Sequence, residues 1–269
     1  MSQDIDHLRE IIARLRAPGG CPWDREQTQS TLAPSLIEEA YEVVDAIDRA
    51  HDSDLEEELG DLLINILMQA EIASEKDGFT IDSIARNASE KLVRRHPHVF
   101  GESSAQTSEA VLTQWEEIKQ AERKSKGLDQ TPDSSLLDGV ARAFPALVRA
   151  QKIQKKAAKV GFDWESAGGV VAKIREEVSE VEIELSEFEK SGTKDRLTEE
   201  LGDLLFAVVN LTRFLSIDAE SALHAATKKF EKRFWDMERT LPQGSEFKDL
   251  SSAEMNDLWE KAKLREDKN

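Results

Sequence analysis

The 269-residue sequence is poor in cysteine, proline, glycine and aromatic residues, and each shortage narrows the possible folds. Its one cysteine, Cys21, excludes an intrachain disulfide and a zinc site built from several thiolates. With 7 prolines, 13 glycines and 6% aromatic residues, the chain has few of the residues that favour turns and strands. Alanine, leucine, glutamate and lysine recur throughout and favour helices. The composition therefore predicts an all-α protein.

Long apolar runs are also missing. No run approaches the about 18 residues that a membrane-spanning helix needs, and no basic leader precedes an apolar segment at the N-terminus. The net charge of −18 disfavours a nucleic-acid-binding groove, which needs dense lysine and arginine. A small polyanion still fits if a metal cation mediates the contact. We therefore expect a soluble cytoplasmic protein with neither a membrane nor a nucleic acid as its partner.

What the sequence does contain is an internal repeat. Residues 57–63 read Glu-Glu-Leu-Gly-Asp-Leu-Leu, and the same residues return at 199–205. A second pattern, Glu-Glu-x-x-Glu, precedes each copy; it comprises Glu38, Glu39 and Glu42 in the first copy and Glu176, Glu177 and Glu180 in the second. The repeat is far longer than the period of solenoid proteins and so predicts tandem domains. We expect one helical module at 1–122, a polar linker at 123–138 and a second module at 139–269.

Apolar residues at helical spacing, interrupted by glycine and proline, predict the individual helices. The expected ranges are 3–16, 33–50, 54–75, 80–95 and 108–124 in the first module, and 139–158, 167–190, 195–214, 219–239 and 251–265 in the second. His96-Pro97 should end the fourth of these helices. Residues 21–24 should form a turn whose Trp23 either fills the core or lines a binding pocket.

The acidic residues hold a particular position on these helices. At about 100° per residue, Glu39 and Glu42 flank the apolar stripe of their helix and do not oppose it. Glu58 and Asp61 flank the stripe of the next helix in the same way. The second copy repeats the pattern with Glu177 and Glu180, then Glu200 and Asp203. If the two helices of each copy pack antiparallel through their stripes, the acidic edges meet along one side.

Carboxylates that converge at a half-buried seam repel one another unless a cation neutralises them. Hard oxygen ligands without soft donors suit Mg²⁺, with Mn²⁺ as a possible substitute. A di-iron bundle would require Glu-x-x-His, and none of the 5 histidines lies three residues after a glutamate. A hydrated metal held in this way typically binds phosphates. The alternative is that these glutamates simply lie on solvent-exposed helix faces, as most single glutamates do.

The two copies differ in the cations around this seam. Lys173 and Arg196 stand on the acidic edge of the second copy, where the first copy has Ser35 and Asp54. Other cations and tryptophans recur in both copies: Lys91, Arg95 and Trp115 in the first, and Lys229, Arg233 and Trp259 in the second. A lone lysine or arginine is usually a solvated surface residue, and a helical tryptophan usually belongs to the core. The joint pattern nevertheless favours the second copy as the polyphosphate site.

Taken together, these motifs resemble the MazG family of nucleoside triphosphate pyrophosphohydrolases, within the all-α NTP pyrophosphatase superfamily. Further stretches that resemble the family are Cys-Pro-Trp-Asp at 21–24, Arg-Arg-His-Pro-His-Val-Phe at 94–100 and Val-Gly-Phe-Asp-Trp at 160–164. The resemblance implies two tandem four-helix-bundle-like modules, a homodimer, magnesium dependence and cleavage of NTP to NMP and pyrophosphate. Its metal ligands carry over to Glu177, Glu180, Glu200 and Asp203, and by the repeat to Glu39, Glu42, Glu58 and Asp61. Its nucleotide contacts carry over to Lys173, Arg196, Lys229, Arg233 and Trp259.

The expected reaction is attack of a metal-activated water on the α-phosphorus, with broad tolerance of the base. Lys229 and Arg233 would carry the charge of the leaving pyrophosphate, Glu176 would act as base or hold an outer water, and Trp259 would stack on the base. The first module departs from the family at Ser35 and Asp54, so we expect the second module to carry the activity. Two alternatives remain open: a non-catalytic helical interaction protein, and another metal-dependent phosphohydrolase that releases phosphate.

Overall fold

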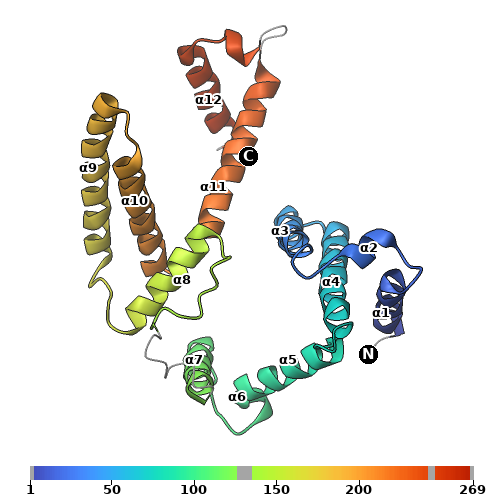
Figure 1. The fold of residues 1–269 in the computed structure, drawn as a ribbon. Coiled ribbons are helices and arrows are strands. Elements are labelled where there is room, and N and C mark those ends of the chain that lie inside the picture. The colour runs from blue at the N-terminus through green and yellow to red at the C-terminus, as the bar shows by residue number, and fades with distance from the viewer. Residues whose placement is uncertain (1–2, 126–134, 242–245, 267–269) are drawn as a thin grey trace. The chain divides into compact units, whose positions relative to one another are not determined.

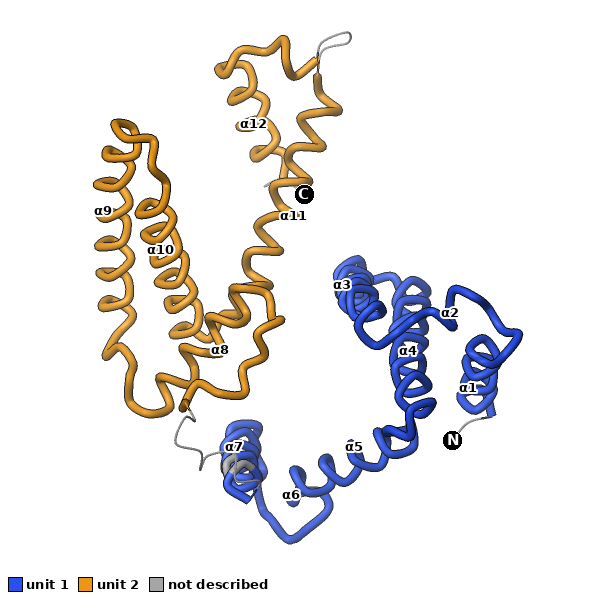
Figure 2. Tube along the Cα trace, viewed as in Figure 1, with its two compact units in different colours: residues 1–129 blue, residues 130–269 orange. Residues whose placement is uncertain are grey.

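The computed structural model describes residues 3–125, 135–241 and 246–266, and these form helices and connecting turns without any strand (Figure 1). They divide into two compact units, 1–129 and 130–269 (Figure 2). The first unit contains α1 (Gln3–Arg16), α2 (Pro22–Glu26), α3 (Ala33–Arg49), α4 (Asp52–Ser74), α5 (Ile81–Arg95), α6 (Pro97–Phe100) and α7 (Ser108–Ser125). The second contains α8 (Ala146–Lys159), α9 (Ala167–Ser191), α10 (Asp195–Phe214), α11 (Ala219–Thr240), the short 3₁₀ helix η1 (Phe247–Asp249) and α12 (Ser252–Glu266).

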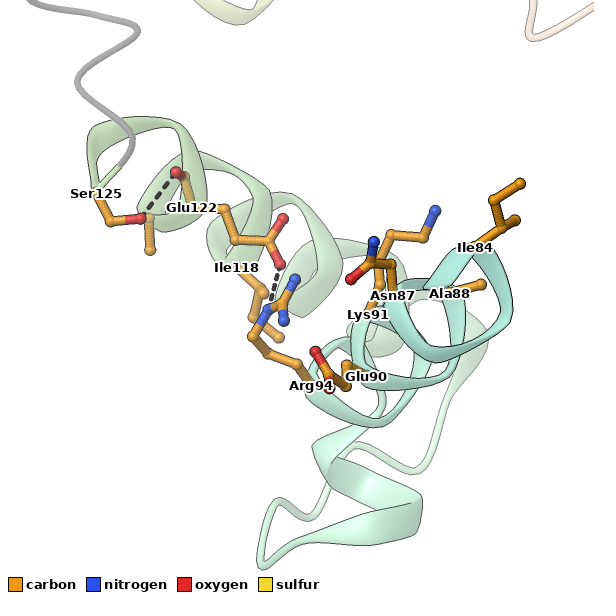
Figure 3. A pocket seen from close by; sticks show the side chains of 10 residues that line it. Ile84, Asn87, Ala88, Glu90, Lys91, Arg94, Ile118, Glu122 and Ser125 are labelled. Atoms are coloured by element: carbon orange, nitrogen blue, oxygen red, sulfur yellow. Dashed lines mark hydrogen bonds and ion pairs between the residues drawn. The ribbon is translucent and has the colours of Figure 1, made fainter. Parts of the chain in front are cut away.

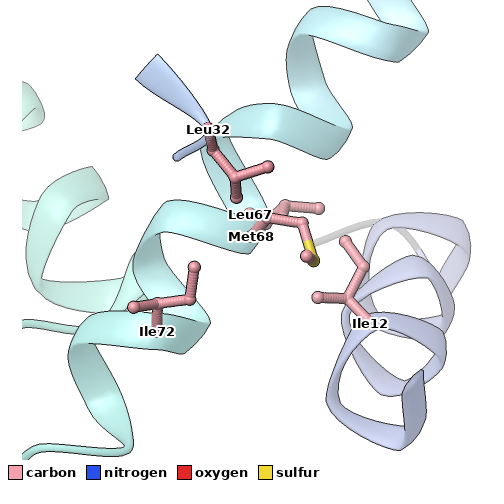
Figure 4. Close-up of a cluster of buried hydrophobic side chains, with 5 residues drawn as sticks. All are labelled: Ile12, Leu32, Leu67, Met68 and Ile72. Atoms are coloured by element: carbon pink, nitrogen blue, oxygen red, sulfur yellow. The ribbon is translucent and has the colours of Figure 1, made fainter. Parts of the chain in front are cut away.

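In the first unit, α3 and α4 form a helical hairpin, and α1 packs against α4. A cluster of buried apolar side chains joins these elements; it consists of Ile12, Leu32, Leu67, Met68 and Ile72 (Figure 4). The connection from α4 to α5 is closed by a capping box, in which Thr80 and Ser83 exchange side-chain and backbone hydrogen bonds. Helix α5 ends at Arg95, directly before the His96-Pro97 pair, as the sequence predicts.

The second unit repeats the hairpin with α9 and α10, and α8 packs against α10 in the place that α1 takes against α4. Ser166 caps α9 by accepting a hydrogen bond from the Gly169 backbone, and Gly192 ends it in the left-handed conformation at φ 72°. Helix α11 packs with both α8 and α12. Each acidic pattern therefore lies on a two-helix hairpin that a third helix supports.

The expectation of an all-α protein made of two tandem helical modules is confirmed. The predicted linker, 123–138, contains the boundary between the units, although its residues 126–134 lie outside the described part of the chain. One helix start was predicted wrongly: α8 begins at Ala146 and not near 139, because Gly139 adopts φ 85° and Pro145 caps the helix. The short helices α2 and α6 were also missed, each being a single proline-initiated turn.

The apolar stripes are less buried than the sequence pattern implies. Helix pairing covers one side of each stripe and leaves many of its residues exposed, among them Val44, Ile47, Leu59, Val178, Leu185, Leu201 and Val208. Trp23 is 62% exposed and does not fill the core. The reason is geometric: each helix of a hairpin covers only the part of the stripe that faces it, and the rest of the stripe stays exposed. None of the described helices is both long and apolar enough to cross a membrane.

Candidate metal and nucleotide site

The acidic patterns of the second unit converge as their helical phase predicts. Glu177 on α9 and Glu200 and Asp203 on α10 each offer a carboxylate oxygen, and these oxygens lie within 4.8 Å of one another. Glu177 is only 5% exposed, because the antiparallel packing of α9 on α10 covers this edge of its helix. Three negative charges thus share a small, partly dehydrated volume, an arrangement that is unfavourable without a cation.

Glu180 lies one helical turn after Glu177 and borders the same cluster. Partial loss of hydration raises the pKa of Glu180, and the neighbouring carboxylates of Glu177 and Glu200 raise it further. A raised pKa means that the ionised form is disfavoured in the protein without metal. A divalent cation would remove that penalty, and so Glu180 fits the role of an additional ligand.

Two of the predicted cations stand directly at this cluster. Lys173 Nζ lies 2.7 Å from a Glu176 oxygen and 2.8 Å from a Glu177 oxygen. These two carboxylates raise the pKa of Lys173, so the ammonium group stays charged at neutral pH. Arg196 lies on the other helix and reaches Glu200 at 3.4 Å. Positive charge therefore flanks the acidic seam from both helices.

The other three predicted nucleotide contacts gather elsewhere in the unit, on α11 and α12. Arg233 donates to Glu266 at 2.6 Å, and its guanidinium lies 5.6 Å from the centre of the Trp259 ring. Phe230 packs on the same tryptophan at a ring separation of 5.3 Å. The Arg233 hydrogen bond lowers the pKa of Glu266, and the nearby charge of Lys229 adds to that effect. Among the described contacts, none joins Lys229, Arg233 or Trp259 to the carboxylates of α9 and α10.

The first unit forms a matching acidic cluster with different surroundings. Oxygens of Glu39, Glu58 and Asp61 lie within 4.8 Å of one another. Loss of hydration and the neighbouring carboxylates, including Glu42, raise the pKa of both Glu39 and Glu58. Ser35 stands where Lys173 stands in the second unit, and its hydroxyl lies 3.5 Å from Glu39. This cluster thus gains a hydroxyl where the other gains an ammonium group.

In the first unit, the two arginines at the end of α5 form ion pairs with one glutamate. Arg94 and Arg95 both donate to Glu122 on α7, at 2.7 and 2.6 Å. Figure 3 shows Arg94 and Glu122 beside Lys91 in the groove between α5 and α7. The paired arginines hold the pKa of Glu122 at about 2, well below its usual range. Each unit therefore pairs an arginine with a glutamate of its last helix: Arg95 with Glu122 on α7, and Arg233 with Glu266 on α12.

A cavity of about 600 Å³ opens beside the second acidic cluster, and its lining includes Lys173, Glu177 and Asp203. The rest of the lining comes from Leu137, α8, the 160–164 loop and α10, and it includes the amides of Gln154 and Asn210 beside the Asp163–Arg213 ion pair. Sequence reasoning missed both. A signal was present for Asn210, which lies 142 residues after the apolar Met68, the same spacing that relates Glu58 to Glu200.

The donor set fits a hard divalent cation. Opposite ligands of Mg²⁺ lie about 4.2 Å apart, twice its Mg–O distance, and therefore oxygens within 4.8 Å of one another can share one ion after small adjustments. Glu177, Glu200 and Asp203 would hold the ion, with Glu180 alongside. Carboxylates without histidine or cysteine favour magnesium or manganese over zinc.

Comparison with known proteins gives one consistent result. The chain matches the MazG nucleotide pyrophosphohydrolase domain at residues 27–100 and again at 166–236. It is 48% identical to a nucleoside triphosphate pyrophosphohydrolase of Escherichia coli K12, over 97% of this chain and 98% of that protein. It is 44% identical to the nucleoside triphosphate pyrophosphohydrolase/pyrophosphatase MazG of Thermotoga maritima, over 96% and 95% of the two chains. This protein, with its two acidic helical hairpins, therefore belongs to the MazG nucleotide pyrophosphohydrolase family.

Proposed function

We propose that this protein hydrolyses nucleoside triphosphates to nucleoside monophosphate and pyrophosphate, at a Mg²⁺ site in the second unit. The observation that carries the proposal is the cluster of Glu177, Glu200 and Asp203, whose oxygens lie within 4.8 Å of one another beside two cations and a cavity. The similarity to named pyrophosphohydrolases over nearly the full chain supports the same reaction. Because such substrates are made and used in the cytoplasm, we propose that location as well.

In this proposal the carboxylates bind the metal and the cations bind phosphate. Glu177, Glu180, Glu200 and Asp203 would hold the metal, which would supply an activated water and shield the phosphate charge. Lys173 is fully charged and stands at the edge of the cluster, in a position to attract a phosphate oxygen. Arg196 offers a planar donor from the opposite helix.

Glu176 is the residue we assign to proton transfer. Its side chain is 58% exposed and is held by Lys173 at 2.7 Å, outside the group of closely spaced carboxylates. A carboxylate in this position can accept a proton from an attacking water or orient it through a second water. We also assign the charge of the departing pyrophosphate to Lys229 and Arg233. Arg233, which lies over the Trp259 ring and pairs with Glu266, would have to exchange that ion pair for the pyrophosphate.

We also propose that the protein works as a homodimer. Apolar residues of α9 and α10 remain 40–60% exposed, including Val178, Leu201 and Leu205. Exposed apolar residues at helical spacing on neighbouring helices form a surface that another helical pair can cover. A second copy of the same hairpin has a matching face, and α3 and α4 also expose apolar residues, among them Val44, Ile47 and Leu59.

Product identification tests the reaction directly. Incubation of ATP with the protein and Mg²⁺ should yield AMP and pyrophosphate in equal amounts, detectable by ion-exchange chromatography. Glu177→Gln and Asp203→Asn should each lower turnover by more than about 100-fold, since ligand losses exceed the effects of outer residues, while helicity is retained. Release of phosphate and ADP would point to a different phosphohydrolase. Full activity of both variants would show that the metal site has been assigned to the wrong carboxylates.

A further inference from the structure

One carboxylate of the second unit faces the cations to which we assign the departing pyrophosphate. Glu266 accepts a hydrogen bond from Arg233 Nε at 2.6 Å, and the two side chains are only 24% and 18% exposed. The Arg233 bond lowers the pKa of Glu266, which is therefore ionised at neutral pH. The charges of Lys232 and Lys229 add to this effect. Glu266 thus holds the guanidinium group that a phosphate oxygen would have to reach.

Arg233 is positioned by more than this ion pair. Its guanidinium lies 5.6 Å from the centre of the Trp259 ring, within the range of a cation–π contact. Phe230 packs on the same ring at a separation of 5.3 Å and supports the tryptophan. The aromatic pair therefore keeps the arginine in position even when Glu266 leaves it.

The packing of α12 on α11 does not depend on Glu266 either. A second ion pair joins these helices, between Arg265 and Asp236 at 2.6 Å, and Ala262 of α12 is only 2% exposed. Glu266 is the last residue of α12, and the final turn of a helix frays readily. Its carboxylate can therefore move away from Arg233 while α12 remains docked.

The first unit contains the same ion pair in a tighter form. Glu122 lies seven residues after Trp115, just as Glu266 lies seven residues after its own tryptophan. Glu122, however, accepts from two arginines of α5, at 2.7 and 2.6 Å, and Figure 3 shows one of them. Two charge-assisted bonds are harder to break than one. The pair of the second unit, with a single arginine, is therefore the easier one to open.

We propose that Glu266 is an internal competitor for phosphate at Arg233. It holds the arginine in the substrate-free protein and is displaced when a pyrophosphate group binds. The proposal rests on the proposed function, because pyrophosphate is the product that we assign to Arg233. Every ligand that needs Arg233 binds more weakly by the fraction of molecules in which Glu266 has released it. The carboxylate thereby keeps pyrophosphate from remaining bound after cleavage.

The test is the isosteric change Glu266→Gln, which keeps the shape of the side chain and removes its charge. Titration calorimetry measures the Kd of inorganic pyrophosphate in the presence of Mg²⁺. We expect this Kd to fall by about fivefold, the upper range for loss of a partly exposed ion pair. The inhibition constant of pyrophosphate and the KM for ATP should fall by the same factor.

Asp236→Asn is the matched control, because it removes the same charge from the other ion pair between α11 and α12. It should leave the affinity for pyrophosphate unchanged. A double-mutant cycle with Arg233→Ala separates direct competition from a general effect of charge. Without the arginine, the change Glu266→Gln should lose its effect on the Kd.

Three results would overturn the proposal: wild-type or weaker binding of pyrophosphate by Glu266→Gln, an equal gain in Asp236→Asn, or a gain that persists without Arg233. These affinities do not depend on turnover. If the wild type makes no pyrophosphate from ATP but Glu266→Gln still binds pyrophosphate more tightly, the proposed reaction is wrong and the competition stands. If ATP yields pyrophosphate but Glu266→Gln keeps the wild-type affinity, the reaction stands and the competition is wrong.

Discussion

Lys173 is the side chain that most clearly separates the two acidic clusters. It places an ammonium group 2.8 Å from Glu177, whereas Ser35 places a neutral hydroxyl 3.5 Å from Glu39. A cation at this distance offsets the repulsion among closely spaced carboxylates, and it also provides a contact for phosphate. The charge of one residue thus changes both the resting electrostatics of the cluster and what it can bind.

Another ion pair, between Arg16 and Glu75, links α1 to the end of α4. The Arg16 side chain is 5% exposed, and Glu75 accepts hydrogen bonds from it at 2.5 and 2.8 Å. The Arg16 hydrogen bond lowers the pKa of Glu75. A carboxyl with a lowered pKa stabilises the fold above its unfolded value of about 4.3, and that stability is lost as the pH falls through the folded pKa.

We predict that Glu75→Gln weakens the docking of α1 at pH 7 by roughly 1 kcal/mol, at the low end because the carboxylate is partly in water. Amides of α1 should then exchange about fivefold faster in hydrogen–deuterium exchange. The difference from the wild type should shrink as the pH falls from about 4.3, the unfolded pKa, through the lower folded pKa of Glu75, below which the carboxyl is protonated in both states. The exposed Glu26→Gln is the control. A difference that persists unchanged in acid would show that the charge of Glu75 is not responsible.

At the level of helices, the sequence pattern predicts the elements well and their packing less well. Helices α1, α3, α9 and α10 begin and end within about one residue of their predicted bounds, because periodicity and capping residues act locally. The stripes that periodicity marks as core are only half covered within the described chain. Periodicity shows that a face needs a partner but does not say whether that partner is in the same chain.

The exposed face of α10 gives a test of the proposed homodimer. Leu201, Leu205 and Val208 lie on one side of the helix, and Leu205 is 60% exposed. Leu205→Glu should shift the protein toward the monomer in sedimentation equilibrium, because a charge would be buried in the interface. Circular dichroism should show unchanged helicity. The exposed change Thr227→Glu on α11 should leave the mass unchanged, and a monomeric wild type would refute the dimer.

For the molecule as a whole, the two units are unequal copies. Both bring three carboxylates within 4.8 Å, yet only the second places Lys173, Arg196 and the polar cavity around them. We therefore predict that Glu39→Gln keeps most of the ATP turnover, whereas Glu177→Gln loses it. Steady-state rates of the two matched variants decide this. Loss of activity in Glu39→Gln alone would assign catalysis to the first unit.

Ligand linkage provides a readout that does not depend on turnover. A non-hydrolysable ATP analogue with Mg²⁺ at about 100 times its Kd should stabilise the second unit by about 2.7 kcal/mol. Differential scanning calorimetry should then show one transition move to higher temperature and the other stay in place. Glu177→Gln should abolish the shift, and Glu39→Gln should leave it intact. A protein that only binds other proteins would show no shift at all.

The amino-acid sequence was sufficient for the all-α class, the duplication, the helices and the choice of carboxylates. These depend on local periodicity and on residue spacing, and a helix converts spacing into a face without help from the rest of the chain. Glu177 and Asp203 could be named in advance for that reason. Lys173 and Arg196 could be placed on the same edge by the same reasoning.

Tertiary packing was needed for the features that depend on distance between helices. It separated Lys173 and Arg196, which contact the carboxylates, from Arg233 and Trp259, which contact Glu266 and Phe230. It also revealed the cavity, because a void is the volume that neighbouring side chains leave unfilled and has no pattern of its own along the chain. Gln154 lines this cavity because α8 packs against α10, where its amide donates to the Phe206 carbonyl.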